Sequence, residues 1–200
     1  MKGTRRRLLV MLALEVVLVG CVVGVYLGLR APRTRDTWGY EEHLSDGSLR
    51  EVFSAHKADF LALRDMILAE PRLHSVGDDN VGAYWRYGQT WHDSQGSPVR
   101  EGEMLRRVGL AETRYSVYLQ RLKRVGAYRV TTQGGEVGTG EAAIHVYRAG
   151  MGISGEGKDI VFLLDPPEHL ADNTDSAMGN KTGLWYSRLE EDWYIKFWRS

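Results

Sequence analysis

Apolar residues recur at helical spacing in two segments of the chain. From Asp46 to Pro71 the period is near four, which predicts an amphipathic helix with one buried face. Asp46 or Ser48 can cap its start, because a side-chain oxygen accepts the first free backbone N–H groups, and Pro71 ends it. A second helix is predicted from about Ala111 to Val125, with Gly126 as its terminator.

After Gly126 the period changes from near four to two, in runs rich in β-branched and aromatic residues. The predicted strands are Tyr128 to Thr132, Ala142 to Arg148, Asp159 to Leu164, Leu184 to Leu189 and Trp193 to Trp198. Short links favour antiparallel pairing, so the predicted fold class is α+β, with two main helices packed on an antiparallel sheet of about five strands. In the last strand Trp193, Ile195 and Phe197 share one face, and we expect them in the core.

The segment from Leu73 to Gly102 shows no clear period but is rich in aromatic residues. Trp85, Tyr87 and Trp91 form the candidate binding surface, because exposed indole and phenol rings are flat apolar platforms with a polar edge, suited to sugars or protein partners. The alternative is that these rings build the core of a small domain.

The stretch from Leu8 to Leu29 is apolar except for Glu15. At about 1.5 Å of rise per residue it could cross a hydrocarbon core of about 30 Å, so it predicts a transmembrane anchor. The predicted organisation is a cytoplasmic tail (1–7), the anchor (8–29), a linker (30–45) and a soluble domain (46–200). The positive-inside bias favours an extracytoplasmic domain, on a bacterial inner membrane, with the reverse topology open.

Gly20, Gly24 and Gly28 lie four residues apart and share one face of the predicted anchor. Such a face lets two helix backbones approach closely, so we expect a weak homodimer through the anchor. The alternative is a lone helix, because small residues are frequent in membrane spans. Glu15 lies on the opposite side, where either a second membrane protein covers it or its side chain reaches headgroup water. In the competing interpretation the segment is a lipoprotein signal, and Cys21, the single cysteine, is the lipidated residue.

Charge excludes one class of partner. Residues 1 to 35 hold seven basic residues and one acidic residue, so residues 36 to 200 are acidic by six charges, because each sign totals 26 over the chain. Phosphate backbones require a basic face, so nucleic acid is not an expected partner. With only one cysteine, the domain has neither a disulfide framework nor a thiolate metal site.

No motif indicates catalysis. Residues 152 to 158 match the first part of a phosphate-binding loop, but Asp159 replaces the required hydroxyl residue and a strand follows instead of a helix, which favours a hairpin loop. The six histidines are scattered without metal-ligand spacing. We therefore expect no metal, no cofactor and no catalytic residue recognisable from the sequence.

The order of helix, irregular segment, helix and glycine-punctuated strands, over Leu49 to Trp198, is similar to small membrane-anchored bacterial proteins with no assigned activity. That resemblance implies the fold and no function. The leading hypothesis is a non-catalytic, membrane-tethered binding or accessory domain of the cell envelope, whose partner is an envelope protein or a glycan. The alternatives are an envelope hydrolase whose site assembles only in three dimensions, for example around His74 or His92, and an inhibitor or immunity protein for a basic partner.

Overall fold

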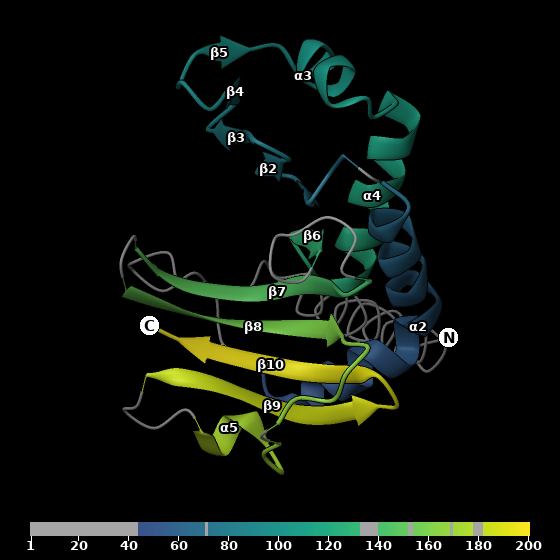
Figure 1. The fold of residues 1–200 in the computed structure, drawn as a ribbon, viewed down its shortest axis with the longest axis vertical. Coiled ribbons are helices and arrows are strands. Elements are labelled where there is room, and N and C mark those ends of the chain that lie inside the picture. Colours follow the sequence, from purple (N-terminus) through teal and green to yellow (C-terminus); the bar gives the residue numbers. More distant parts are fainter. Residues whose placement is uncertain (1–43, 71, 133–139, 152–153, 169, 178–181) are drawn as a thin grey trace, which may run out of the picture. The chain divides into compact units, whose positions relative to one another are not determined.

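The computed structural model describes residues 44–70, 72–132, 140–151, 154–168, 170–177 and 182–200, all within one unit of the chain (Figure 1). Their helices are α2 (Asp46–Leu68), α3 (Glu101–Val108), α4 (Glu112–Val125) and α5 (Thr174–Ala177). Their strands are β1 (Ser75–Gly77), β2 (Asn80–Val81), β3 (Tyr84–Tyr87), β4 (Thr90–His92), β5 (Pro98–Val99), β6 (Arg129–Thr132), β7 (Ala142–Met151), β8 (Ser154–Phe162), β9 (Gly183–Glu190) and β10 (Trp193–Arg199).

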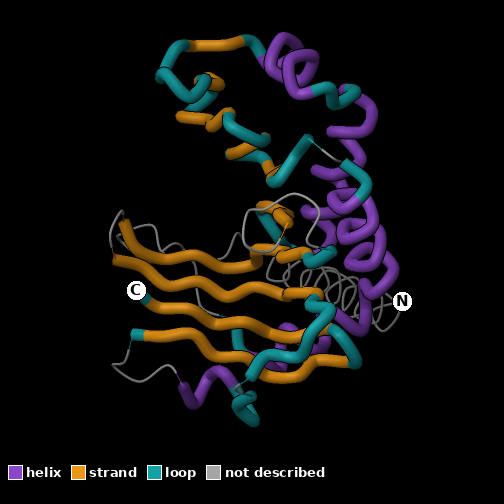
Figure 2. The backbone as a smooth tube through the Cα atoms, viewed as in Figure 1, coloured by secondary structure: helices purple, strands orange, loops and turns teal. Residues whose placement is uncertain are grey.

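The ten described strands form one antiparallel sheet in the order β5-β4-β3-β2-β1-β6-β7-β8-β10-β9 (Figure 2). The α+β class is confirmed, but the predicted sheet of about five strands is wrong. The missed strands, β1 to β5, contain at most four residues each, which is too few to display a period of two. Gly82, Gly88 and Gly96 close the turns around them with positive φ angles, which a residue with a side chain rarely adopts.

The two predicted main helices are present as α2 and α4, and α4 ends at Gly126 in the left-handed conformation. The cap of α2 is Ser45, whose hydroxyl accepts the Ser48 N–H at 3.1 Å, so Asp46 is free for another role. Besides these two main helices, the structure contains α3 and the four-residue α5.

The core lies between α2, α4 and one face of the sheet. Phe53 and Phe60 of α2 pack around Trp193 of β10, with ring centroids 5.3 and 6.4 Å from the Trp193 centroid. Trp193, Ile195 and Phe197 are all buried, which confirms the predicted inward face of the last strand. On the opposite face of the sheet a smaller apolar cluster contains Ala143, Val161, Leu163 and Tyr194.

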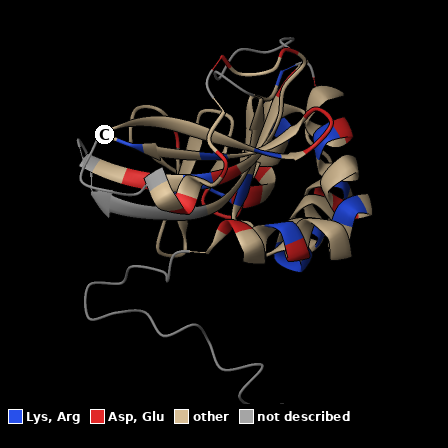
Figure 3. Ribbon diagram, turned by 90° about the horizontal axis from the view of Figure 1, so that it is seen from below, with Lys and Arg blue, Asp and Glu red and all other residues tan. Residues whose placement is uncertain are grey.

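The described helices contradict two predictions, the transmembrane architecture and the inner-membrane location. None of them combines the length and the apolar character needed to cross a bilayer. The longest, α2, has 23 residues but is amphipathic, and Figure 3 shows acidic and basic positions intermixed along the helices. The segment Leu8 to Leu29 that carried the prediction, with Glu15, Gly20, Cys21, Gly24 and Gly28, lies outside the described residues.

Candidate binding site

The predicted aromatic surface is divided between two environments. Trp85 and Tyr87 of β3 are 42% and 77% exposed, and the Trp85 ring stacks on His92 with centroids 4.7 Å apart. Trp91 of β4 is instead buried, and its indole N–H donates to a Glu101 carboxylate oxygen at 3.1 Å. Two of the three rings therefore lie on one exposed face, while Trp91 belongs to the core.

The glycine-rich segment was predicted as a hairpin loop, but from Ser154 onward it belongs to strand β8, which pairs with β7 as a hairpin. Its lysine, Lys158, is fully buried and donates to Asp46 at 2.6 Å, to Asp175 at 2.5 Å and to the Leu44 carbonyl at 3.0 Å. All three ammonium protons are therefore used inside the protein. A lysine held this way cannot reach a phosphate.

The Asp46 carboxylate is equally saturated. Besides Lys158 it accepts the Thr174 N–H at 2.8 Å, the Thr174 hydroxyl at 2.5 Å and the Ser187 hydroxyl at 2.6 Å. Burial opposes ionisation of Asp46, but the hydrogen bonds from Lys158, Ser187 and Thr174 outweigh it and lower the pKa of this carboxyl. This network fastens the start of α2 to α5, β8 and β9, and it leaves no lone pair for a ligand.

A different set of polar residues crosses the opposite face of the sheet. Arg129 of β6, His145 of β7, Asp159 of β8, Lys196 of β10 and Tyr186 of β9 are register partners from one strand to the next. Because partners in adjacent strands project to the same side, these five side chains form one polar row. Burial raises the pKa of the Tyr186 phenol, and the Glu141 and Asp159 carboxylates raise it further, so Tyr186 stays neutral.

Asp159 is the most unusual member of this polar row. It is 1% exposed, and only one of its two carboxylate oxygens has a hydrogen-bond partner among the described residues. Its Oδ1 lies 2.7 Å from His145 Nδ1, whereas its Oδ2 has no hydrogen-bond partner among the described residues. On the other side of the imidazole, His145 Nε2 lies 2.9 Å from the Thr131 hydroxyl. The two contacts fix the plane of the imidazole and leave one carboxylate oxygen unused.

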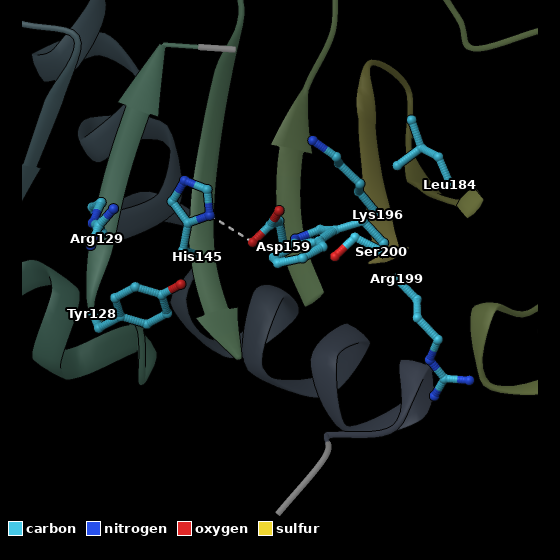
Figure 4. Close-up of a pocket in the computed structure, with 9 residues that line it drawn as sticks. Tyr128, Arg129, His145, Asp159, Leu184, Lys196, Arg199 and Ser200 are labelled. Atoms are coloured by element: carbon cyan, nitrogen blue, oxygen red, sulfur yellow. Dashed lines mark hydrogen bonds and ion pairs between the residues drawn. The ribbon is translucent and has the colours of Figure 1, made fainter. Parts of the chain in front are cut away.

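An open groove of about 520 Å³ lies over this part of the polar row. It is lined by Tyr128, Arg129, His145, Asp159, Leu184, Lys196, Trp198, Arg199 and Ser200. Figure 4 shows Asp159 between His145 and Lys196, with the Tyr128 ring beside the imidazole. A groove of this size, with aromatic walls and a few polar groups, is typical of small-ligand sites.

Gly157 determines the position of the indole that lines the groove. A Cβ atom at Gly157 would stand only 2.5 Å from Nε1 and 2.6 Å from Cε2 of Trp198, its register partner in β10. The indole can lie against the sheet only because that Cβ is missing. The glycine thus gives the groove a flat aromatic wall.

Two of the cations in the groove are already paired. Arg129 donates to both carboxylate oxygens of Asp79, and Arg199 binds Glu156. Lys196 makes no ion pair with any residue that the structure describes. The charges left in the groove are therefore one ammonium and one half-satisfied carboxylate.

The histidines that the sequence analysis selected do not form this site. Neither His74 nor His92 lines the groove, and no group of three or more potential metal ligands occurs within the described residues. His145 and Asp159 were visible only as an isolated histidine and as the residue that breaks a phosphate-loop motif. A sharper signal was available in their placement, because each is a polar residue inside a predicted strand.

Comparisons with protein-family models, with curated proteins and with solved structures find no match for this chain. Its function must therefore be argued from the chemistry of the groove.

Proposed function

We propose that this domain is a non-catalytic binding module whose ligand occupies the groove over β7, β8 and β10. One observation carries the proposal: Asp159, which lines the groove, keeps a buried carboxylate oxygen, Oδ2, that has no hydrogen-bond partner among the described residues. Leaving a buried acceptor unsatisfied costs about 1–3 kcal/mol, and more when it is charged. A ligand N–H or O–H directed at Oδ2 would recover that free energy.

The other groove residues support binding rather than chemistry. Trp198 and Leu184 offer apolar surface, and Lys196 offers a donor beside the Asp159 acceptor. Fixed donors and acceptors around an apolar surface orient a ligand and give specificity. A binding role of this kind requires no reactive group in the groove.

A fragment screen on the full, isotope-labelled chain tests the proposal. The panel contains neutral sugars, primary amides, amines and inorganic phosphate, and the readout is the change in protein NMR signals. We expect at least one fragment class to shift signals of groove residues. The matched variants are Asp159→Asn, which replaces the acceptor with a donor of the same shape, and Glu51→Gln, which removes an exposed charge on α2.

Binding by donor fragments should weaken in Asp159→Asn and persist in Glu51→Gln. If no fragment class perturbs the groove at millimolar concentration, or if both variants respond alike, the binding proposal is wrong.

A hydrolase is the second candidate, because Thr131, His145 and Asp159 form a hydroxyl–imidazole–carboxylate chain with distances of 2.9 and 2.7 Å. Two features disfavour it. Thr131 does not line the groove, and β6 pairs with both β1 and β7, so its ladder provides no free N–H pair for an oxyanion.

An ester hydrolysis assay separates the two candidates. The binding proposal expects the wild type and Thr131→Val to hydrolyse p-nitrophenyl acetate at the same background rate. A large loss of turnover in Thr131→Val would establish the hydrolase instead.

A further inference from the structure

The charges in the groove restrict the kind of ligand it can hold. Asp159 and Lys196 carry opposite charges, and the two arginines are neutralised by Asp79 and Glu156. A phosphate or another anion would meet the unpaired oxygen of Asp159, and a cation would meet Lys196. The groove therefore suits a neutral ligand that carries both a donor and an acceptor.

The spacing of Asp159 and Lys196 restricts the ligand further. The two residues are direct register partners on β8 and β10, so their Cβ atoms are about 4.5–5.5 Å apart. One ligand group must donate to the carboxylate while a neighbouring group accepts from the ammonium. Adjacent hydroxyl groups satisfy both requirements, because each hydroxyl can donate and accept.

The wall of the groove favours a ring over an extended chain. The Trp198 indole lies flat against Gly157, and Leu184, which is 49% exposed, adds apolar surface. Such a wall packs against the C–H groups of a flat ring face. An extended peptide usually gains affinity by pairing with a free strand edge, but β8 pairs along the groove with both β7 and β10.

We propose that the ligand of this groove is a neutral sugar ring, with its apolar face on Trp198 and two adjacent hydroxyl groups bound by Asp159 and Lys196. This inference rests on the proposed binding function and adds the chemical class of the ligand. The volume of about 520 Å³ lies within the range of about 300–1,000 Å³ found for small-ligand sites.

The experiment is a titration of the full, isotope-labelled chain, followed through the indole N–H signals of its six tryptophans. The probes are glucose, mannose, galactose, N-acetylglucosamine and cellobiose, each neutral. Glucosamine, glucuronic acid and acetamide are the charged and non-sugar controls. Trp198→Phe assigns the relevant signal and preserves a flat ring.

We expect at least one neutral sugar to bind with millimolar affinity and to shift the Trp198 signal. Its affinity should fall on the order of tenfold or more in Asp159→Asn, because a hydrogen bond to a charged group is lost, and should fall less in Trp198→Phe. The charged analogues should bind more weakly than their neutral parents.

Different titration results would overturn the sugar assignment and the binding function. If acetamide or a charged probe perturbs the groove and no neutral sugar does, the sugar assignment is overturned while the binding function stands. If none of the probes perturbs the groove, both are overturned. A sugar that shifts signals equally in the wild type and in Asp159→Asn also overturns the assignment, because Asp159 is then not its acceptor.

Discussion

Two buried aspartates lie on opposite faces of the same sheet, and their surroundings differ. Asp46 is 2% exposed and accepts from Lys158, Ser187 and both polar groups of Thr174. Asp159 is 1% exposed, and within the described part of the chain only one of its oxygens has a partner, His145. Burial alone does not distinguish a structural group from a functional one, whereas the remaining hydrogen-bonding capacity does.

We therefore expect the two aspartates to have separate roles. The Asp46 network joins elements that are distant in sequence, so its removal should lower stability. Asp159 lines the groove and has one oxygen that no described residue satisfies, so its removal should affect binding with little effect on stability. Four variants or conditions examine this difference, in order of the expected loss of stability.

The largest loss is expected for Lys158→Met. The substitution keeps an unbranched chain in a fully buried position and leaves the Asp46 carboxylate without its counter-ion. Breaking a buried ion pair costs about 3–5 kcal/mol, so the free energy of unfolding from urea denaturation should fall by that amount. The double variant Asp46→Asn with Lys158→Met should recover part of the loss, and a single variant within about 0.5 kcal/mol of the wild type would refute the structural role.

A smaller loss is expected for Gly157→Ala. The new Cβ would overlap the Trp198 indole, and displacing the ring should lower the free energy of unfolding by about 1–3 kcal/mol. The sugar affinity should fall with it, as measured by the indole titration. Gly47→Ala is the control, because its Cβ would meet only Ser45 Oγ at an ordinary 3.7 Å, and unchanged binding in Gly157→Ala would show that the indole wall is dispensable.

Acid should weaken the Asp46 network. The folded-state pKa of Asp46 lies below its ordinary value of 3.8, so its contribution is complete above that pH and is lost as the pH falls through the folded-state pKa. The free energy of unfolding of the wild type should therefore fall more steeply below pH 3.8 than that of Asp46→Asn, which has no carboxyl to protonate there. Parallel curves for the two proteins would contradict this expectation.

The smallest loss is expected for Asp159→Asn. The amide oxygen can still accept from His145, and a half-satisfied buried charge is removed, so the free energy of unfolding should change by less than about 1 kcal/mol. The sugar affinity should nevertheless fall about tenfold. A stable variant with full affinity would remove Asp159 from the binding site.

Local patterns predicted the parts of the fold that depend on neighbours in sequence. The helical spacing gave α2 and α4, and the alternation of Trp193, Ile195 and Phe197 identified the buried face of β10. The strands before α3 were missed because runs of two to four residues carry no detectable period.

The sites could not be predicted by the same means. Asp46 lies 112 positions from Lys158, and the two meet only because α2 is fastened to the sheet. His145 and Asp159 meet through the register of β7 and β8, which shifts between His145 and Tyr147, and no local pattern encodes that register. The sequence analysis grouped Trp85, Tyr87 and Trp91 because they are close in sequence. In the pleated strands β3 and β4, however, Trp85 and Tyr87 lie on the exposed face and Trp91 lies on the buried face.

The central claim is that Asp46 contributes to stability and Asp159 to binding. The most direct test measures the free energy of unfolding of Asp46→Asn and Asp159→Asn by urea denaturation of the full chain under identical conditions. We predict a loss of about 3–5 kcal/mol for Asp46→Asn, because its amide cannot satisfy the surrounding donors, and a change of less than about 1 kcal/mol for Asp159→Asn. Equal losses in the two variants, or a larger loss in Asp159→Asn, would contradict the account.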